Sequence, residues 1–150
     1  LENERLEARL KLAKTEKVLS EVIYEQNGGN DNCALMRRKC DQALCNRTTA
    51  QMKERWNINN KPLADFMPTI LLKAKDVATE ITIYNARENN MQSENKISNE
   101  HATNNKAVRD TLISRGITPE NVKPEEDIKK VERKLASEKK KALDSKDSLK

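Results

Sequence analysis

The chain has 150 residues and a formal net charge of +5; 35% of its residues are hydrophobic, 35% are charged and 3% are aromatic. Its mean hydropathy of -0.93 is typical of exposed helices rather than of a large apolar core. The apolar runs are too short for a membrane-spanning helix, and the first residues lack the pattern of a signal peptide. We therefore expect a cytoplasmic protein that does not enter the membrane.

A long amphipathic helix is predicted from residue 1 to about residue 26, where Gly28 and Gly29 in an Asn-rich run end it. Its apolar residues alternate with charged ones and are Leu6, Leu10, Leu12, Ala13, Val18, Leu19, Val22 and Ile23. A second helix is predicted from about Cys33 to Leu44. Its expected inward residues are Ala34, Leu35, Cys40, Ala43 and Leu44.

Thr48 or Thr49 is predicted to cap a short helix that ends near Trp56. The next helix, near residues 62–88, is called the spine helix, and we expect a kink or a break at Pro68. Apolar residues at steps of three and four predict its buried face: Leu63, Phe66, Met67, Ile70, Ala74, Val77, Ala78 and Ile81. We expect this helix to organise the core.

A loop is predicted from Asn89 to Lys96, followed by a helix that Ser98 caps and Gly116 closes as its C′ residue. Its expected inward residues are Ala102, Val108, Leu112 and Ile113. Prolines then precede a last helix, and we expect disorder beyond Ala142. Its apolar stripe is Ile128, Val131 and Leu135.

The fold class predicted from these patterns is all-α. We expect an irregular multi-helix fold of about five helices in all, with a long amphipathic N-terminal helix and a basic C-terminal helix; the helical domain is expected over residues 1–123. Residues 124–150 are expected to form a basic C-terminal helix and a frayed tail. No strand pattern competes with these helices.

Several short motifs occur in a fixed order along most of the chain. They are Thr48, Thr49, Gln51, Met52 and Lys53; Pro62 to Phe66; Lys73 to Asp76, Ala78, Glu80 to Thr82 and Asn85; His101, Asn104, Asn105, Val108 and Arg109; and Arg115 to Ile117, Pro119, Glu120 and Glu126 to Lys130. In this order they resemble the C-terminal half of the bacterial DNA-damage-inducible protein D family. The resemblance contains no catalytic signature.

The resemblance also has departures. Members of the family have a Gly and an aromatic residue near the positions of Cys40 and Cys45, and a pair of glycines where this chain has Asn46 and Arg47. This bears on any tight turn there, because Gly tolerates a positive φ and Arg does not. In the family, an N-terminal domain of the phage-associated BRO type precedes this region, and that domain is absent from this sequence.

Basic residues are concentrated near the C-terminus. Residues 128–150 contain nine basic and four acidic residues, a net charge of +5 that equals that of the whole chain. Such a helix can neutralise phosphates in a salt-dependent way, although a solvated terminal helix has the same composition. The expected nucleic-acid-binding residues are Lys129, Lys130, Arg133, Lys134, Lys139, Lys140 and Lys141, with Arg37, Arg38 and Lys39 as a second cluster.

The polar residues of the family-like motifs are expected to face a partner protein. They are Lys73, Lys75, Asp76, Glu80, Asn85, Asn104, Asn105 and Arg109. The alternative for the acidic residues of the spine helix is simple ion pairing on an exposed face. In that case Asp65, Asp76 and Glu80 would pair with Lys61, Lys73 or Lys75.

Metal binding and catalysis find no support in the sequence. Cys33, Cys40 and Cys45 form an odd-numbered set that argues against a disulfide framework, and they lack the paired spacing of a zinc site. We expect buried thiols, no metal and no other cofactor. His101 is the only histidine, so no nucleophile with a base can be assembled around it, and we interpret it as a first-turn residue that packs locally. We expect a protein that is not an enzyme.

Two functions follow as expectations. The resemblance implies an interaction module of a bacterial DNA-damage response, whose expected partners are single-stranded DNA and a recombinase filament or another repair protein. The amphipathic N-terminal helix instead suggests a structural role, in which the chain forms a homodimer and positions the missing N-terminal domain.

Overall fold

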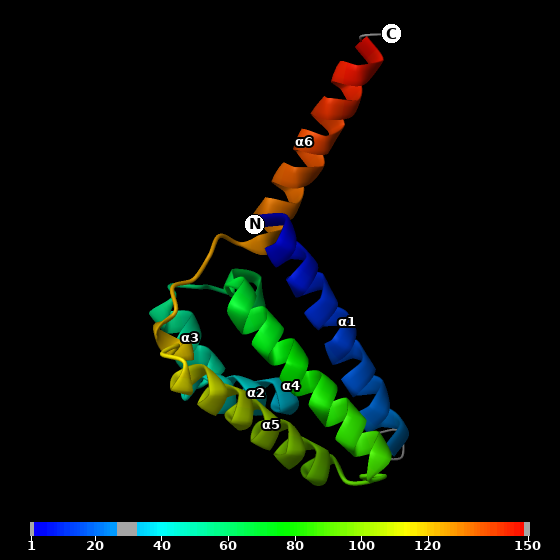
Figure 1. Ribbon diagram of the computed structural model, residues 1–150, viewed down its shortest axis with the longest axis vertical. Helices are drawn as coiled ribbons and strands as arrows, with labels where there is room; N and C mark the ends of the chain where they lie inside the picture. Colours follow the sequence, from blue (N-terminus) through cyan, green and yellow to red (C-terminus); the bar gives the residue numbers. More distant parts are fainter. Residues whose placement is uncertain (1, 27–32, 149–150) are drawn as a thin grey trace.

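The computed structural model describes residues 2–26 and 33–148, and this part of the chain is helical without any strand (Figure 1). The predicted all-α class is confirmed, with six α-helices rather than about five in the described residues. The elements are α1 (Glu2–Gln26), α2 (Cys33–Cys45), α3 (Thr49–Arg55), the 3-10 helix η1 (Leu63–Phe66), α4 (Thr69–Glu88), α5 (Glu94–Ser114), the 3-10 helix η2 (Pro119–Asn121) and α6 (Ile128–Ser148).

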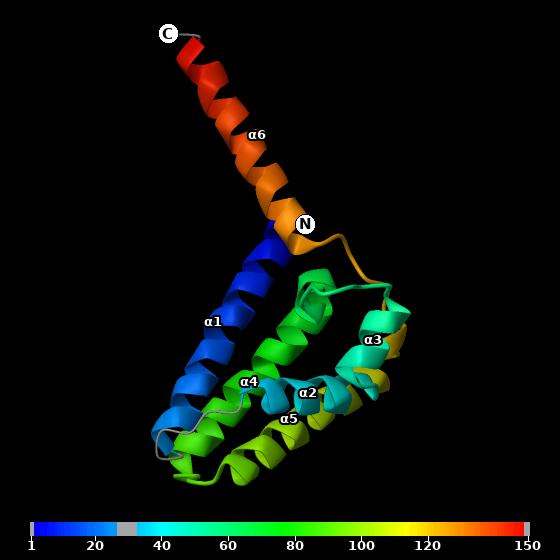
Figure 2. The same ribbon diagram turned by 180° about the vertical axis from the view of Figure 1, so that it is seen from behind.

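Helix α4 lies at the centre of the body. It packs against α1 on one side and against α5 on another, while α2 packs on α5 (Figures 1 and 2). Helix α6 starts beside the N-terminal end of α1 and then projects away from the body. No helix in the described ranges is both long enough and apolar enough to cross a membrane.

The buried apolar residues form two clusters, one at each end of α4. The first includes Leu12 of α1, Leu44 of α2 and Leu71 of α4. The second includes Val22 of α1, Ile83 of α4 and Ile97 of α5. Buried polar side chains lie between the two clusters along the same helices: Thr15 on α1, Lys75, Thr79 and Thr82 on α4, and Ser98, His101, Asn104 and Asn105 on α5. We call this set the polar layer.

The predicted buried face of the spine helix is partly wrong. Ile70, Val77 and Ile81 are 43%, 53% and 38% exposed, and Ile113 on α5 is 42% exposed. The face of α4 that packs inside consists of Leu71, Leu72, Ala74, Lys75, Ala78, Thr79, Thr82, Ile83 and Ala86. The periodicity of large apolar residues misplaced the buried face because six of these nine inward residues are small or polar.

Several predicted helix ends are confirmed. Thr48 is the N-cap of α3, where its Oγ1 accepts from the Gln51 N–H at 3.1 Å and Gln51 Oε1 accepts from the Thr48 N–H at 2.9 Å. The chain breaks at Pro68, which separates η1 from α4. Gly116 follows α5 with a φ of +81°, as a C′ glycine does.

Other predicted ends differ. Ser93 rather than Ser98 caps α5, because the helix starts one turn earlier and leaves Ser98 buried inside it. The predicted loss of structure beyond Ala142 does not occur, since α6 is helical to Ser148. The substitution of the family's glycines does not remove the tight turn after α2, because Asn46 adopts a φ of +52°, a conformation that Asn tolerates better than most residues. The predicted stop at Gly28 and Gly29 lies outside the described residues.

Candidate nucleic-acid interface

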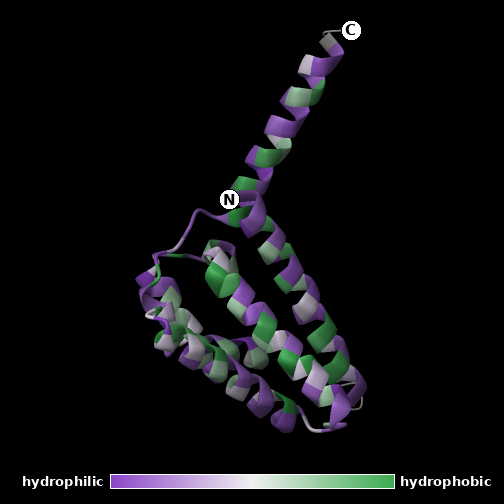
Figure 3. Cartoon of the chain, viewed as in Figure 1, coloured by the Kyte–Doolittle hydropathy of each residue, from purple (hydrophilic) through white to green (hydrophobic). Residues whose placement is uncertain are grey.

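Helix α6 presents a cationic face to solvent. At about 100° per residue, Lys129, Lys130, Arg133, Lys134, Lys140 and Lys141 fall within an arc of about 140°, and all six are exposed. Ile128, Val131 and Leu135 occupy the opposite side. Lys139 lies outside the arc of cations. Six of the seven residues of this helix that were predicted to bind nucleic acid therefore share one face. Hydrophilic residues alternate with a few apolar ones along the projecting part (Figure 3).

The base of α6 is fixed to the body. Ile128 and Val131 are buried, and Asp127 Oδ1 accepts from the Lys129 N–H at 3.0 Å. Lys61 Nζ lies 2.8 Å from the other oxygen, Asp127 Oδ2. Burial raises the pKa of Asp127, but the hydrogen bonds from Lys61 and from the backbone of Lys129 lower it more, so the pKa lies below its ordinary value. The carboxylate thus stays charged at the start of the helix, where it is favoured by the helix dipole.

A buried arginine joins α1 to the segments before α4 and α6. The Arg5 guanidinium donates to the carbonyls of Asp65 and Met67 at 3.4 and 3.3 Å and also to the carbonyl of Glu126. One turn further on, Arg9 Nε lies 2.9 Å from Asp65 Oδ1. These contacts hold the origin of α6 against the N-terminal end of α1.

The second predicted cluster lies on α2. Arg37 and Arg38 are exposed as expected, whereas Lys39 is half-buried. Arg37 and Arg38 line a pocket of about 530 Å³ whose other walls come from α1, α3 and the segment before η1. We call it the α1–α3 pocket. The sequence did not predict it, because its walls are distant in the chain.

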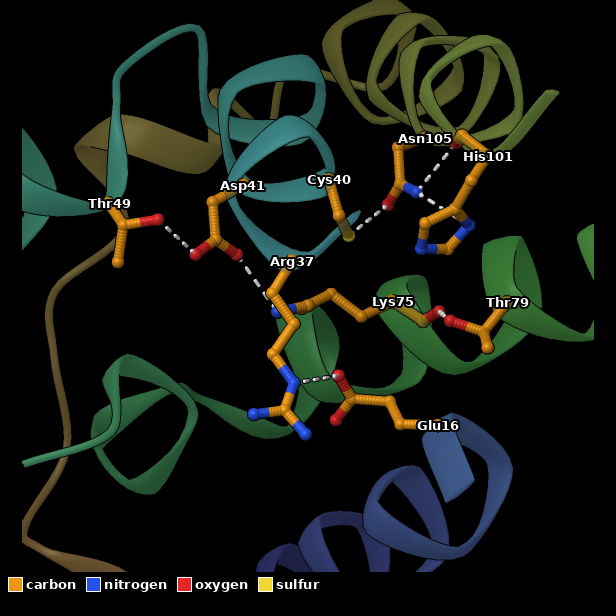
Figure 4. A network of polar contacts seen from close by, with 9 residues as sticks. All are labelled: Glu16, Arg37, Cys40, Asp41, Thr49, Lys75, Thr79, His101 and Asn105. Carbon is orange, nitrogen blue, oxygen red and sulfur yellow. Dashed lines mark hydrogen bonds and ion pairs between the residues drawn. The ribbon is translucent and has the colours of Figure 1, made fainter. Parts of the chain in front are cut away.

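A buried ion pair closes one side of this pocket. Lys75 Nζ of α4 lies 2.9 Å from Asp41 Oδ1 of α2, and both side chains are 6% exposed (Figure 4). Thr49 Oγ1 donates to Asp41 Oδ2 at 2.7 Å. Burial lowers the pKa of Lys75, but the charges of Asp41 and Glu16 and the hydrogen bond to Asp41 raise it more, so the pKa lies above its ordinary value and the ammonium stays charged.

The polar layer continues from Lys75 to α5. Thr82 Oγ1 donates to the Ala78 carbonyl at 2.9 Å, and the same oxygen lies 2.9 Å from both His101 Nδ1 and Asn104 Nδ2. Asn105 Oδ1 accepts from Cys40 Sγ at 3.2 Å (Figure 4). Burial, with the nearby charge of Lys75, lowers the pKa of His101 to about 4. The imidazole is therefore neutral at pH 7.

The first-turn role predicted for His101 is wrong, because the residue is 4% exposed and lies within α5 rather than at its start. The predicted partner-binding residues do not share one face either. Lys73 and Glu80 are exposed, and Asp76, Asn85 and Arg109 are half-buried. The other three, Lys75, Asn104 and Asn105, are buried in the polar layer and are not available to a partner.

The ion pairs expected within the spine helix are also wrong. Asp65 pairs with Arg9, as described above, and Glu80 Oε1 lies 3.0 Å from Lys11 Nζ of α1. Arg109 makes a bidentate contact with Glu120 of η2, at 2.6 and 3.0 Å, and donates to the Leu44 carbonyl at 3.0 Å. These contacts connect different elements, which a scan for pairs one turn apart does not detect.

Cys40 and Cys45 are buried, and burial raises the pKa of each thiol to about 12. The described residues contain no group of three metal-ligating side chains.

Between α4 and α5, a groove of about 470 Å³ is lined by the exposed side chains of Ile70, Val77 and Ile81 together with Ala107 and Val108.

No known protein family, curated protein or solved structure matches this chain.

Proposed function

We propose that this chain is a helical interaction module that binds nucleic acid through the cationic face of α6. The observation that carries the proposal is the placement of six exposed cations on one side of a helix that projects from the body. From Lys129 to Lys141 the face is about 18 Å long, at about 1.5 Å per residue, so it can follow several phosphates of one strand.

Binding of this kind depends on the release of counterions. For single-stranded nucleic acid, each neutralised phosphate contributes about -0.7 to the slope of log affinity against log salt. The described aromatic residues do not interleave with the cations of α6, so we expect affinity without base selectivity.

The test is fluorescence anisotropy with a labelled single-stranded oligonucleotide at several salt concentrations. A variant with Lys129, Lys130, Arg133 and Lys134 replaced by Gln should bind at least about tenfold more weakly and show a shallower slope. The matched control replaces four exposed lysines of the body by Gln, with the same change in net charge: Lys14, Lys17, Lys96 and Lys106. Equal losses in the two variants would remove α6 from the mechanism.

The biological setting that we propose is a bacterial DNA-damage response. Its support is the resemblance of the ordered motifs to the DNA-damage-inducible protein D family, and the expected partners are single-stranded DNA and the recombinase filament that forms on it. Co-sedimentation with preformed recombinase filaments is the direct measurement. Binding to bare DNA, with none to the filament, would restrict the role to nucleic acid.

Self-association is the second candidate function, with the groove between α4 and α5 as its contact surface. Three large apolar side chains exposed on α4, Ile70, Val77 and Ile81, favour it, since contiguous apolar surface is characteristic of interaction sites. Light scattering should then show a dimer that Val77→Glu dissociates, while Tyr24→Glu, at an exposed position on α1 outside the groove, leaves it intact. If light scattering shows a monomer at high concentration, self-association is excluded as a function.

A further inference from the structure

Six of the fourteen residues that line the α1–α3 pocket are cations. They are Arg9 of α1, Arg37 and Arg38 of α2, Lys53 of α3, Lys61 of the segment before η1 and Lys75 of α4. Only two acidic side chains, Glu16 and Asp41, line it with them. Helices α1, α2 and α3 thus contribute positive side chains to one concave surface. This concentration of charge is local, because residues 1–127 together have no formal net charge.

Four of these cations are already paired. Lys75 binds Asp41, Arg9 binds Asp65, Lys61 binds Asp127 and Arg37 Nε lies 3.8 Å from Glu16 Oε2. The last contact is long, and the Arg37 side chain is 66% exposed, so its outer nitrogens are open to another acceptor (Figure 4).

The remaining two cations, Arg38 and Lys53, have no ion-pair partner among the described residues. They approach the pocket from different helices, α2 and α3. The two acids of the pocket cannot neutralise them, because Asp41 is engaged by Lys75 and Thr49, and Glu16 faces Arg37. The pocket therefore carries an uncompensated charge of about two.

We propose that the α1–α3 pocket binds a phosphomonoester dianion, held between Arg38 and Lys53 with Arg37 as a third donor. A phosphomonoester carries about -1.5 to -2 charges at pH 7, which matches the uncompensated charge, whereas the phosphodiester of a nucleic-acid backbone carries one. Arg and Lys are the side chains that bind phosphate oxygens best, Arg through a bidentate fork. The volume of about 530 Å³ lies in the range of small-molecule sites.

The same chemistry is presented by a free mononucleotide and by the 5′ end of a nucleic-acid strand. This inference goes beyond the binding of backbone phosphates by α6, and it involves none of the residues of the cationic face. It predicts a site with one ligand per chain and with discrimination between a monoester and a neutral analogue.

The first experiment is isothermal titration calorimetry of the full chain with deoxyadenosine 5′-monophosphate and with deoxyadenosine. The monophosphate should bind with one site, and the nucleoside should not. Arg38→Gln and Lys53→Gln should each weaken binding about tenfold or more, since each removes a charge-assisted hydrogen bond. The matched controls Lys14→Gln and Lys106→Gln remove exposed cations outside the pocket and should leave the affinity unchanged.

The second experiment separates the two sources of the phosphate and is made in the α6 variant that lacks Lys129, Lys130, Arg133 and Lys134. In this background a 5′-phosphorylated oligonucleotide should bind more tightly than the same oligonucleotide with a 5′-hydroxyl if the site accepts a strand end. Equal binding of the two, with retained binding of the mononucleotide, assigns the site to free nucleotides.

Two results would overturn the proposal. One is the failure of the unmodified chain to bind the monophosphate at millimolar concentration. The other is monophosphate binding that Arg38→Gln and Lys53→Gln weaken no more than the controls do. Neither result depends on whether α6 binds nucleic acid, so the two proposals fail separately.

Discussion

Replacing Lys75 by Met should destabilise the fold strongly. Lys75 Nζ and Asp41 Oδ1 are 2.9 Å apart, and both side chains are 6% exposed. Methionine keeps most of the side-chain volume but leaves the Asp41 carboxylate buried without its counter-charge, and Thr49 Oγ1 is then its remaining side-chain donor. Breaking a buried pair in this way costs about 3–5 kcal/mol.

Urea denaturation, followed by circular dichroism, measures this loss. With an m value of about 2 kcal/mol/M, a loss of about 3–5 kcal/mol lowers the midpoint by about 1.5–2.5 M. The matched control is Lys73→Met, on the exposed side of the same helix, which should change stability by less than about 0.5 kcal/mol.

The double variant Lys75→Met/Asp41→Asn completes a thermodynamic cycle. Removing both charges leaves no unpaired ion inside the fold, so the double variant should be more stable than Lys75→Met alone, with a coupling of at least about 1 kcal/mol. The reasoning is refuted if Lys75→Met costs less than about 1 kcal/mol, or if the two single losses simply add.

Three further predictions concern the polar layer, the thiols and the contact between α5 and η2. Burial lowers the pKa of His101 to about 4, whereas the pKa of a histidine in the unfolded chain is near 6.5, so the unfolded chain binds the proton better. The free energy of unfolding should therefore fall as the pH is lowered from 6.5 towards 4, by at most about 1.4 kcal/mol per pH unit. An NMR titration of this single histidine with a midpoint near 6.5 would contradict this. Cys40 and Cys45 should resist iodoacetamide at pH 8 until urea unfolds the chain, as read by peptide mass spectrometry; rapid native labelling would show exposed thiols. Arg109→Lys loses the bidentate contact with Glu120 and should lower stability by about 1–2 kcal/mol in thermal unfolding, while an unchanged midpoint would mean that the contact is not formed.

Local signals in the sequence predicted three of the helix boundaries correctly. Thr48 with Gln51, the proline at 68 and Gly116 each act through the backbone of their own turn, so no distant contact is needed to recognise them. The cationic residues of α6 could be predicted from the sequence for the same reason, because they are close together in the chain and the helix has few neighbours.

The buried residues were predicted less well from the sequence. Lys75 was expected on the surface because lysine is almost never buried unless it is paired, and its partner Asp41 lies on another helix. Ile70 and Val77 were expected inside because they are large and apolar. The buried face of α4 is instead selected by partners on α1, α2 and α5, and the α1–α3 pocket depends on the same long-range contacts.

The shape of α6 has an electrical consequence. A helix of 21 residues is about 30 Å long, whereas the screening length at physiological salt is about 8 Å. Its far end therefore lies several screening lengths from the acidic groups of the body, and the potential there is set by α6 alone. At low ionic strength the two regions would influence one another, but under cellular conditions the molecule behaves as a neutral body that carries an electrically independent positive rod.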